Sequence, residues 1–231
     1  CKTIPNIIHH FEENHIDYSS INLSTSVVRL NKLRGVKQTN HASEYQERIK
    51  QIFAECEKRV DEFNPQSLSN ILLSMSKSSI IMKHQYESTF LSFTTTIQQN
   101  CDQFNPQGLS NIVWAYAKAG VYSPIVFKAV EKQIPKKITG FNSQALSNTV
   151  WAFSTANYYS PTVFNAVEKQ ISRNYVDFNA QGLSNIVWAY ATANYESSIV
   201  FKAVEKQIPK IIHDFNSQAL SNTVWAFATA N

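Results

Sequence analysis

The chain has 231 residues, of which 43% are hydrophobic and 12% aromatic, so it can bury a core and is not a disordered tail. Five glycines and seven prolines are too few turn residues for a many-stranded β-sandwich. The net charge of +4 permits a nucleic acid or an acidic partner without requiring one. The longest uncharged segment, residues 138–167, is too rich in Asn and Ser to span a bilayer.

In chain order, the elements form an array of repeats. Residues 5–14 predict a helix of an earlier unit, a faint copy begins at Tyr18, and residues 51–60 predict its second helix. A basic and amide-rich insertion at residues 32–40 lengthens this copy. A divergent copy begins at Phe63, and close copies begin at Phe104, Phe141, Phe178 and Phe215, with successive starts 41, 37, 37 and 37 residues apart. The predicted units are 1–62 (degenerate), 63–103 (divergent), 104–140, 141–177, 178–214 and 215–231.

Each unit is predicted to form two helices. Asn105 is a good N-cap for the first helix, which should end at Gly120, and Pro124 begins a second helix that should end at Pro135, as its equivalent should at Pro209. Such a hairpin cannot bury its apolar face alone and must stack on its neighbours. The sequence therefore predicts an all-α protein, an α-solenoid of helix-turn-helix repeats of about 37 residues. The last unit is truncated after its first helix, which indicates a piece of a longer array or an end that dimerises.

A helical wheel separates two sides of the first helix. Leu109, Ile112, Val113 and Tyr116 fall on the predicted core side. An amide, a second amide, a large aromatic and a cation or hydroxyl recur on the other side, which we call the stripe. Its candidate RNA-binding residues are Gln66, Asn70 and Lys77, then Gln107, Asn111, Trp114 and Lys118, then Gln144, Asn148, Trp151 and Thr155, and then Gln181, Asn185, Trp188 and Thr192, with Gln218, Asn222, Trp225 and Thr229 in the last helix. Amides can bind base edges, aromatics can stack on bases and lysines can contact phosphates.

Structural roles compete with this interpretation. The tryptophans can instead pack between repeats, the asparagines can form a hydrogen-bonded ladder between helices, and the glutamines can simply be solvated. Gly108, Ala145, Gly182 and Ala219 allow close helix approach, and such small residues also let a ligand near the backbone. The six histidines and three cysteines show no catalytic or metal-ligand spacing, so we expect no enzyme activity, cofactor, metal or small-molecule substrate.

The phrase LSNIVWAYAKAG and its partner LSNTVWAFATAN resemble the octotricopeptide or heptatricopeptide-type repeats of RAP-domain and FAST-kinase-like proteins. The resemblance implies single-stranded RNA binding in a mitochondrion or chloroplast. It also implies a role in transcript stability, RNA processing, translation or ribosome assembly, with organellar RNA-processing or ribosomal proteins as further partners. It places the stripe asparagines on the RNA-facing helix, and it implies no membrane association. The competing prediction is a protein-interaction scaffold, which the modest net charge supports.

Overall fold

The computed structural model describes residues 4–14, 18–32, 42–77 and 87–230, and within them every regular element is a helix. The α-helices are α1 (Ile4–Asn14), α2 (Ser20–Lys32), α3 (Ala42–Lys58), α4 (Pro65–Lys77), α5 (Glu87–Ser92), α6 (Thr94–Gln99), α7 (Pro106–Ala119), α8 (Pro124–Lys137), α9 (Ser143–Thr155), α10 (Pro161–Asn174), α11 (Ala180–Thr192), α12 (Ser198–Ile211) and α13 (Ser217–Thr229). All of the predicted insertion at 32–40 beyond its first residue lies outside the described residues.

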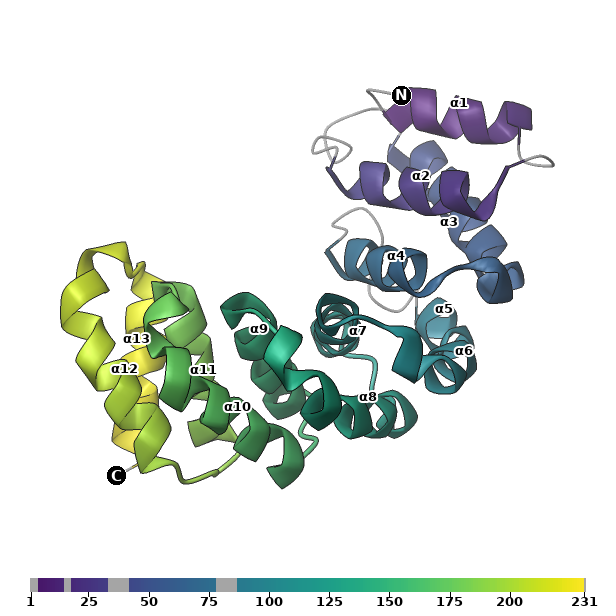
Figure 1. Cartoon of the computed structure of the whole chain (residues 1–231). Coiled ribbons are helices and arrows are strands. Elements are labelled where there is room, and N and C mark those ends of the chain that lie inside the picture. Colours follow the sequence, from purple (N-terminus) through teal and green to yellow (C-terminus); the bar gives the residue numbers. More distant parts are fainter. Residues whose placement is uncertain (1–3, 15–17, 33–41, 78–86, 231) are drawn as a thin grey trace.

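The helices stack in two layers. In one layer, α2, α4, α7, α9, α11 and α13 each pack on the next, and we call these the inner helices. In the other layer, α6 packs on α8, α8 on α10 and α10 on α12. Figure 1 shows the resulting arc, with α4, α7 and α9 toward its inner side and α5, α6 and α8 outside them. This arrangement confirms the predicted all-α solenoid.

The inner helices begin and end at the residues that the sequence indicated. Asn105 Oδ1 accepts a hydrogen bond from the backbone N–H of Gly108 at 2.7 Å, which satisfies a free amide of the first turn of α7. The same cap recurs at Asn142, Asn179 and Asn216. Gly120 ends α7 in the left-handed region at φ 64°, and Asn157 and Asn194 adopt φ 52° and 50° after α9 and α11. These caps fix the length of each inner helix.

The prediction that Pro135 and Pro209 end the outer helices was wrong. Helix α8 continues past Pro135 to Lys137, and α12 continues past Pro209 to Ile211. A proline lacks the N–H that would bond to the carbonyl four positions back, and its ring crowds that carbonyl, but this cost falls at one position and only two helical residues follow each proline here. Each proline therefore lies inside the final turn.

The core follows the predicted face of the inner helices. Leu109, Ile112, Val113 and Tyr116 have no exposed surface. The hydroxyl of Tyr116 donates to the carbonyl of Phe90 at 2.6 Å, and Tyr190 donates to the carbonyl of Phe164 at 2.8 Å. Phe153 occupies the same place in the intervening unit. Helices α7 and α11 are thus hydrogen-bonded through their core faces to α5 and α10, whereas the phenylalanine of α9 cannot make this bond.

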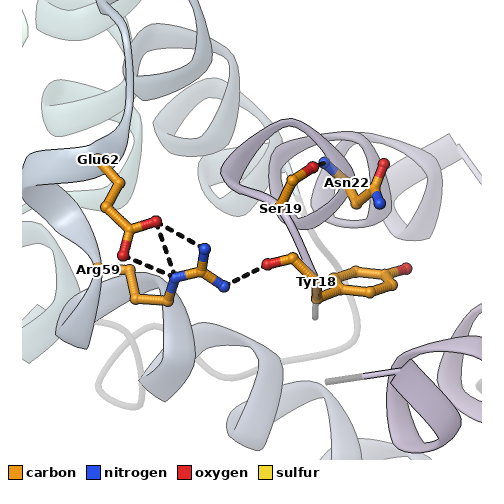
Figure 2. A network of polar contacts seen from close by, with 5 residues as sticks. All are labelled: Tyr18, Ser19, Asn22, Arg59 and Glu62. Carbon is orange, nitrogen blue, oxygen red and sulfur yellow. Dashed lines mark hydrogen bonds and ion pairs between the residues drawn. The ribbon is translucent and has the colours of Figure 1, made fainter. Parts of the chain in front are cut away.

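A polar contact joins the residues just before α2 to those just after α3. Arg59 donates through one terminal nitrogen to the carbonyl oxygen of Tyr18, and its other terminal nitrogen lies 2.6 Å from a carboxylate oxygen of Glu62 (Figure 2). The Tyr18 hydroxyl is buried and lies 2.8 Å from the Ser26 hydroxyl. These hydrogen bonds therefore hold together the two ends of the degenerate repeat that begins at Tyr18.

Within the described residues, no helix is long and apolar enough to cross a membrane.

Among the described helices, none packs on one face of α13. Val224 is 69% exposed and Leu220 is 40% exposed, whereas the equivalent Val150 and Leu146 in α9 are 0% and 4% exposed. The same sequence phrase is therefore core in one helix and surface in the other, because only α9 is covered on both sides.

Candidate nucleic-acid interface

The inner helices have an unusual distribution of charge. Helices α4, α7, α9, α11 and α13 contain no Asp or Glu, and their only charged side chains are Lys77 and Lys118, both exposed. Each lysine lies in the last turn of its helix. The acidic residues of α8, α10 and α12 lie in the other layer. A polyanion therefore meets no carboxylate from these five inner helices.

The stripe residues differ in how far they reach solvent. The glutamines and the final Lys or Thr of each inner helix are exposed, and the asparagines and tryptophans are more deeply set. The exposed members are Gln66, Gln107, Gln144, Gln181, Lys77, Lys118, Thr155 and Thr192, and the partly buried ones are Asn70, Asn148, Asn185, Trp114, Trp151 and Trp188. Asn111 is buried, with 8% of its surface exposed. The structure thus brings the predicted residues onto one continuous surface with a polar rim.

The tryptophans contact one another and the core. The ring centroids of Trp114 and Trp151 are 6.0 Å apart, with the rings tilted by 34°. The ammonium of Lys77 lies 5.2 Å from the ring centroid of Trp114, a cation–π contact between α4 and α7. Trp151 and Trp188 pack against the main core. The rings therefore stabilise the stack of helices and leave only part of each ring for a ligand.

The amides hydrogen-bond within a helix rather than between helices. Gln107 Nε2 donates to Asn111 Oδ1 at 2.9 Å, and Gln218 and Asn222 repeat this bond at 2.8 Å. Among the described contacts, the inner helices are bridged instead by serines, as where Ser110 Oγ donates to a carbonyl of α9 at 3.0 Å. The contacts therefore do not support the alternative of an asparagine ladder, and the stripe glutamines in part position the asparagines.

Two pockets open between adjacent inner helices, near the N-terminal ends of the helices, and the first of them is lined mainly by polar groups. The first, of about 150 Å³, lies between α9 and α11 and is lined by Ser143, Gln144, Ser147, Asn148, Phe178, Asn179, Gln181, Gly182 and Asn185. The second, of about 230 Å³, lies between α4 and α7 and is lined by Asn64, Pro65, Gln66, Gln103, Phe104, Asn105 and Gly108. The serines and cap asparagines were missed as lining residues, although their recurrence at fixed positions in each unit was visible.

The buried thiols are poor nucleophiles. Burial raises the pKa of Cys101 to about 11, and it also raises the pKa of Cys56. Both cysteines are free and buried. Within the described residues, no group of three His, Cys, Asp or Glu side chains could hold a metal ion.

Comparison with known proteins gives one result. The model of a family described as RNA-editing substrate-binding complex 6 protein matches residues 24–231. No curated protein matches the chain. The match names neither octotricopeptide nor RAP-domain proteins, so that assignment of the repeat type stays a prediction.

Proposed function

This chain belongs to the RNA-editing substrate-binding complex 6 family, and from that premise we propose that it binds single-stranded RNA along its inner helices as part of a larger assembly. The observation that carries the proposal is the composition of the stripe. Exposed glutamines, partly buried asparagines and tryptophans and two exposed lysines form one surface, to which its helices contribute no carboxylate. These groups match the base edges, the base faces and the phosphates of a single strand.

The roles divide along the length of each inner helix. Lys77 and Lys118 lie at the C-terminal ends, where an exposed ammonium suits a phosphate. The amides lie nearer the N-terminal ends, at the pockets between helices. We infer that the phosphate backbone follows the edge with the lysines and that bases turn toward the amides. Such a protein positions RNA and carries out no covalent step.

The test is selection from a randomised single-stranded RNA pool on the whole chain at two salt concentrations. We expect enrichment of a motif, with affinity that falls as salt rises because bound phosphates release counterions. If a folded, helical sample retains no RNA at either salt, the proposal fails.

A protein-interaction scaffold is the second candidate function. The family description names a complex, and the exposed side chains of α12 carry both signs of charge, as is common on protein-binding surfaces. Retention of protein partners that is insensitive to RNase and nearly insensitive to salt would favour it. For the compartment we propose the mitochondrion, in keeping with the organellar location that the sequence resemblance implies. A tagged full-length protein found in another compartment would overturn that location.

A further inference from the structure

The inner helices meet through two kinds of interface, and the first kind is bridged by a serine. Ser110 Oγ of α7 donates to the carbonyl of Ala145 in α9 at 3.0 Å. One pair of repeats later, Ser184 Oγ of α11 donates to the carbonyl of Ala219 in α13 at 3.0 Å. All four residues are buried. The α7–α9 and α11–α13 interfaces are therefore held closed by the same side-chain bond.

The equivalent serines of the intervening helices bond within their own helix. Ser69 Oγ of α4 donates to the carbonyl of Gln66, and Ser147 Oγ of α9 donates to the carbonyl of Gln144, each at 3.0 Å. Among the described contacts, the α4–α7 interface has no serine bridge, and the α9–α11 interface has one only toward the C-terminal end of α9, where Ser154 Oγ donates to the carbonyl of Ala189 at 2.7 Å. The two pockets lie at the N-terminal ends of these two interfaces, so bridged and pocketed interfaces alternate along that end of the inner helices.

Glycine and alanine alternate in register with this pattern. The helix that follows each pocket carries Gly108 or Gly182, and the helix that follows each bridge carries Ala145 or Ala219. A Cβ atom on Gly182 would lie 3.6 Å from Ser147 Oγ, which lines the pocket. Glycine therefore leaves space between α9 and α11 that a methyl group would occupy.

The amides of the α9–α11 pocket have free hydrogen-bonding capacity. Among the described contacts, the side chains of Gln144, Asn148, Gln181 and Asn185 make no hydrogen bond with other protein groups, whereas Gln107 is bonded to its neighbouring asparagine. Each free amide offers two N–H donors and one carbonyl acceptor. Converging donors and acceptors in a polar hollow match the Watson–Crick edge of a base.

We propose that the α4–α7 and α9–α11 pockets each take one nucleobase of a bound single strand, so that the array reads one base per pair of repeats. This inference rests on the proposed function, because it names the points at which the bound RNA is read. Adjacent packed helices lie roughly 8–10 Å apart, so the two pockets are about 16–20 Å apart along the stack. Several nucleotides fit in that span, and they pass over the bridged interface without being read.

The test compares two double variants of the whole chain. Gln181→Ala with Asn185→Ala removes amides from the pocket, and the control, Gln133→Ala with Gln170→Ala, removes two half-buried amides from α8 and α10 in the other layer. On the RNA selected by the wild type, we expect a loss of affinity of roughly fivefold or more for the first variant, since the base edge loses its hydrogen-bond partners. One of two specified base positions should also lose its preference. The second variant should lose less than about threefold in affinity and keep the base preference at both specified positions.

A third variant, Gly182→Ala, reduces the pocket without removing an amide. It should stay folded, because alanine occupies this position in α9 and α13, and it should weaken the same base preference. Two results would overturn the proposal of alternating pockets, provided that the wild type binds RNA in a salt-dependent way. In one, both double variants lose affinity equally. In the other, the pocket variants keep every base preference of the wild type. If wild type binds no RNA, the proposed function itself fails. Binding of a peptide in the pocket, lost in the first variant, would likewise exclude RNA as the ligand of this pocket.

Discussion

Lys77 and Lys118 offer the sharpest test of how RNA is held. They are the only charged side chains of α4, α7, α9, α11 and α13, and both are exposed. For single strands, each phosphate contact contributes about 0.7 to the slope of log affinity against log salt, so Lys77→Gln with Lys118→Gln should reduce that slope by about 1.4. If the affinities converge near 1 M salt, the variant at 0.1 M binds about 25-fold more weakly than wild type. The loss should be the same for every RNA sequence, because phosphates carry no base identity.

A matched control separates the position of these lysines from their charge. Lys128→Gln with Lys132→Gln changes the net charge by the same amount on α8, in the outer layer. Fluorescence anisotropy with labelled RNA at a series of salt concentrations gives both slopes. The control variant should lose less than about threefold in affinity. Exposed charges that lie farther from the RNA than the Debye length, about 10 Å at 0.1 M salt, are largely screened. If the slope of log affinity against log salt falls by the same amount in both variants, the lysines act only through the net charge of the protein, and the phosphates do not follow the stripe.

Three stability predictions concern side chains of the inner helices and their N-caps, each measured by urea unfolding of the wild type and the variant. Val150→Ala should cost about 2 kcal/mol because two buried methyl groups are lost, whereas Val224→Ala on the open face should change stability by less than about 0.5 kcal/mol; equal losses would contradict the exposure difference. Asn179→Ala should cost about 1 kcal/mol through the lost N-cap of α11, and no loss would mean that water replaces the cap. Tyr190→Phe should cost about 1 kcal/mol at pH 7. Because burial raises the pKa of Tyr190 well above its usual value of 10, wild type should also lose stability as pH rises past 10, and the variant should lose less.

Local chemistry made most of the fold predictable. Helix α7 begins after Asn105 and ends at Gly120 as expected, because an N-cap residue and a glycine in the left-handed conformation act on their own helix and do not depend on tertiary contacts. The core face followed from the 3.6-residue period for the same reason. Pro135 was misread because a proline disturbs the hydrogen bond to the residue four positions back and does not by itself prevent the two residues after it from staying helical.

The candidate site was predictable in composition but not in detail. The stripe followed from the spacing of its residues, since neighbours on a helix face are fixed by sequence. Hydrogen-bond partners were not predictable, because they depend on how one helix sits against the next. Ser110 and Ser147 occupy equivalent positions in their repeats, yet one bonds across to α9 and the other bonds within its own helix. The alternation of Gly108 and Ala145 was visible in the sequence, but only the packed interfaces give it a physical meaning.

The two-repeat period also resolves a difficulty with near-identical repeats. If every interface read a base through the same amides, the array would specify a monotonous target. An array with pockets at alternate interfaces needs only one readable position per pair of repeats, and the bridged interfaces are then free to set spacing and rigidity. In this arrangement the serine bridge closes one interface and the glycine leaves space at the next interface, so both residues contribute to the alternation. A variant that exchanges the small residues and removes the bridge, with Gly182→Ala, Ala219→Gly and Ser184→Ala together, should move a read position along the RNA by one interface, which selection from a random pool would reveal as a changed spacing between the two specified bases.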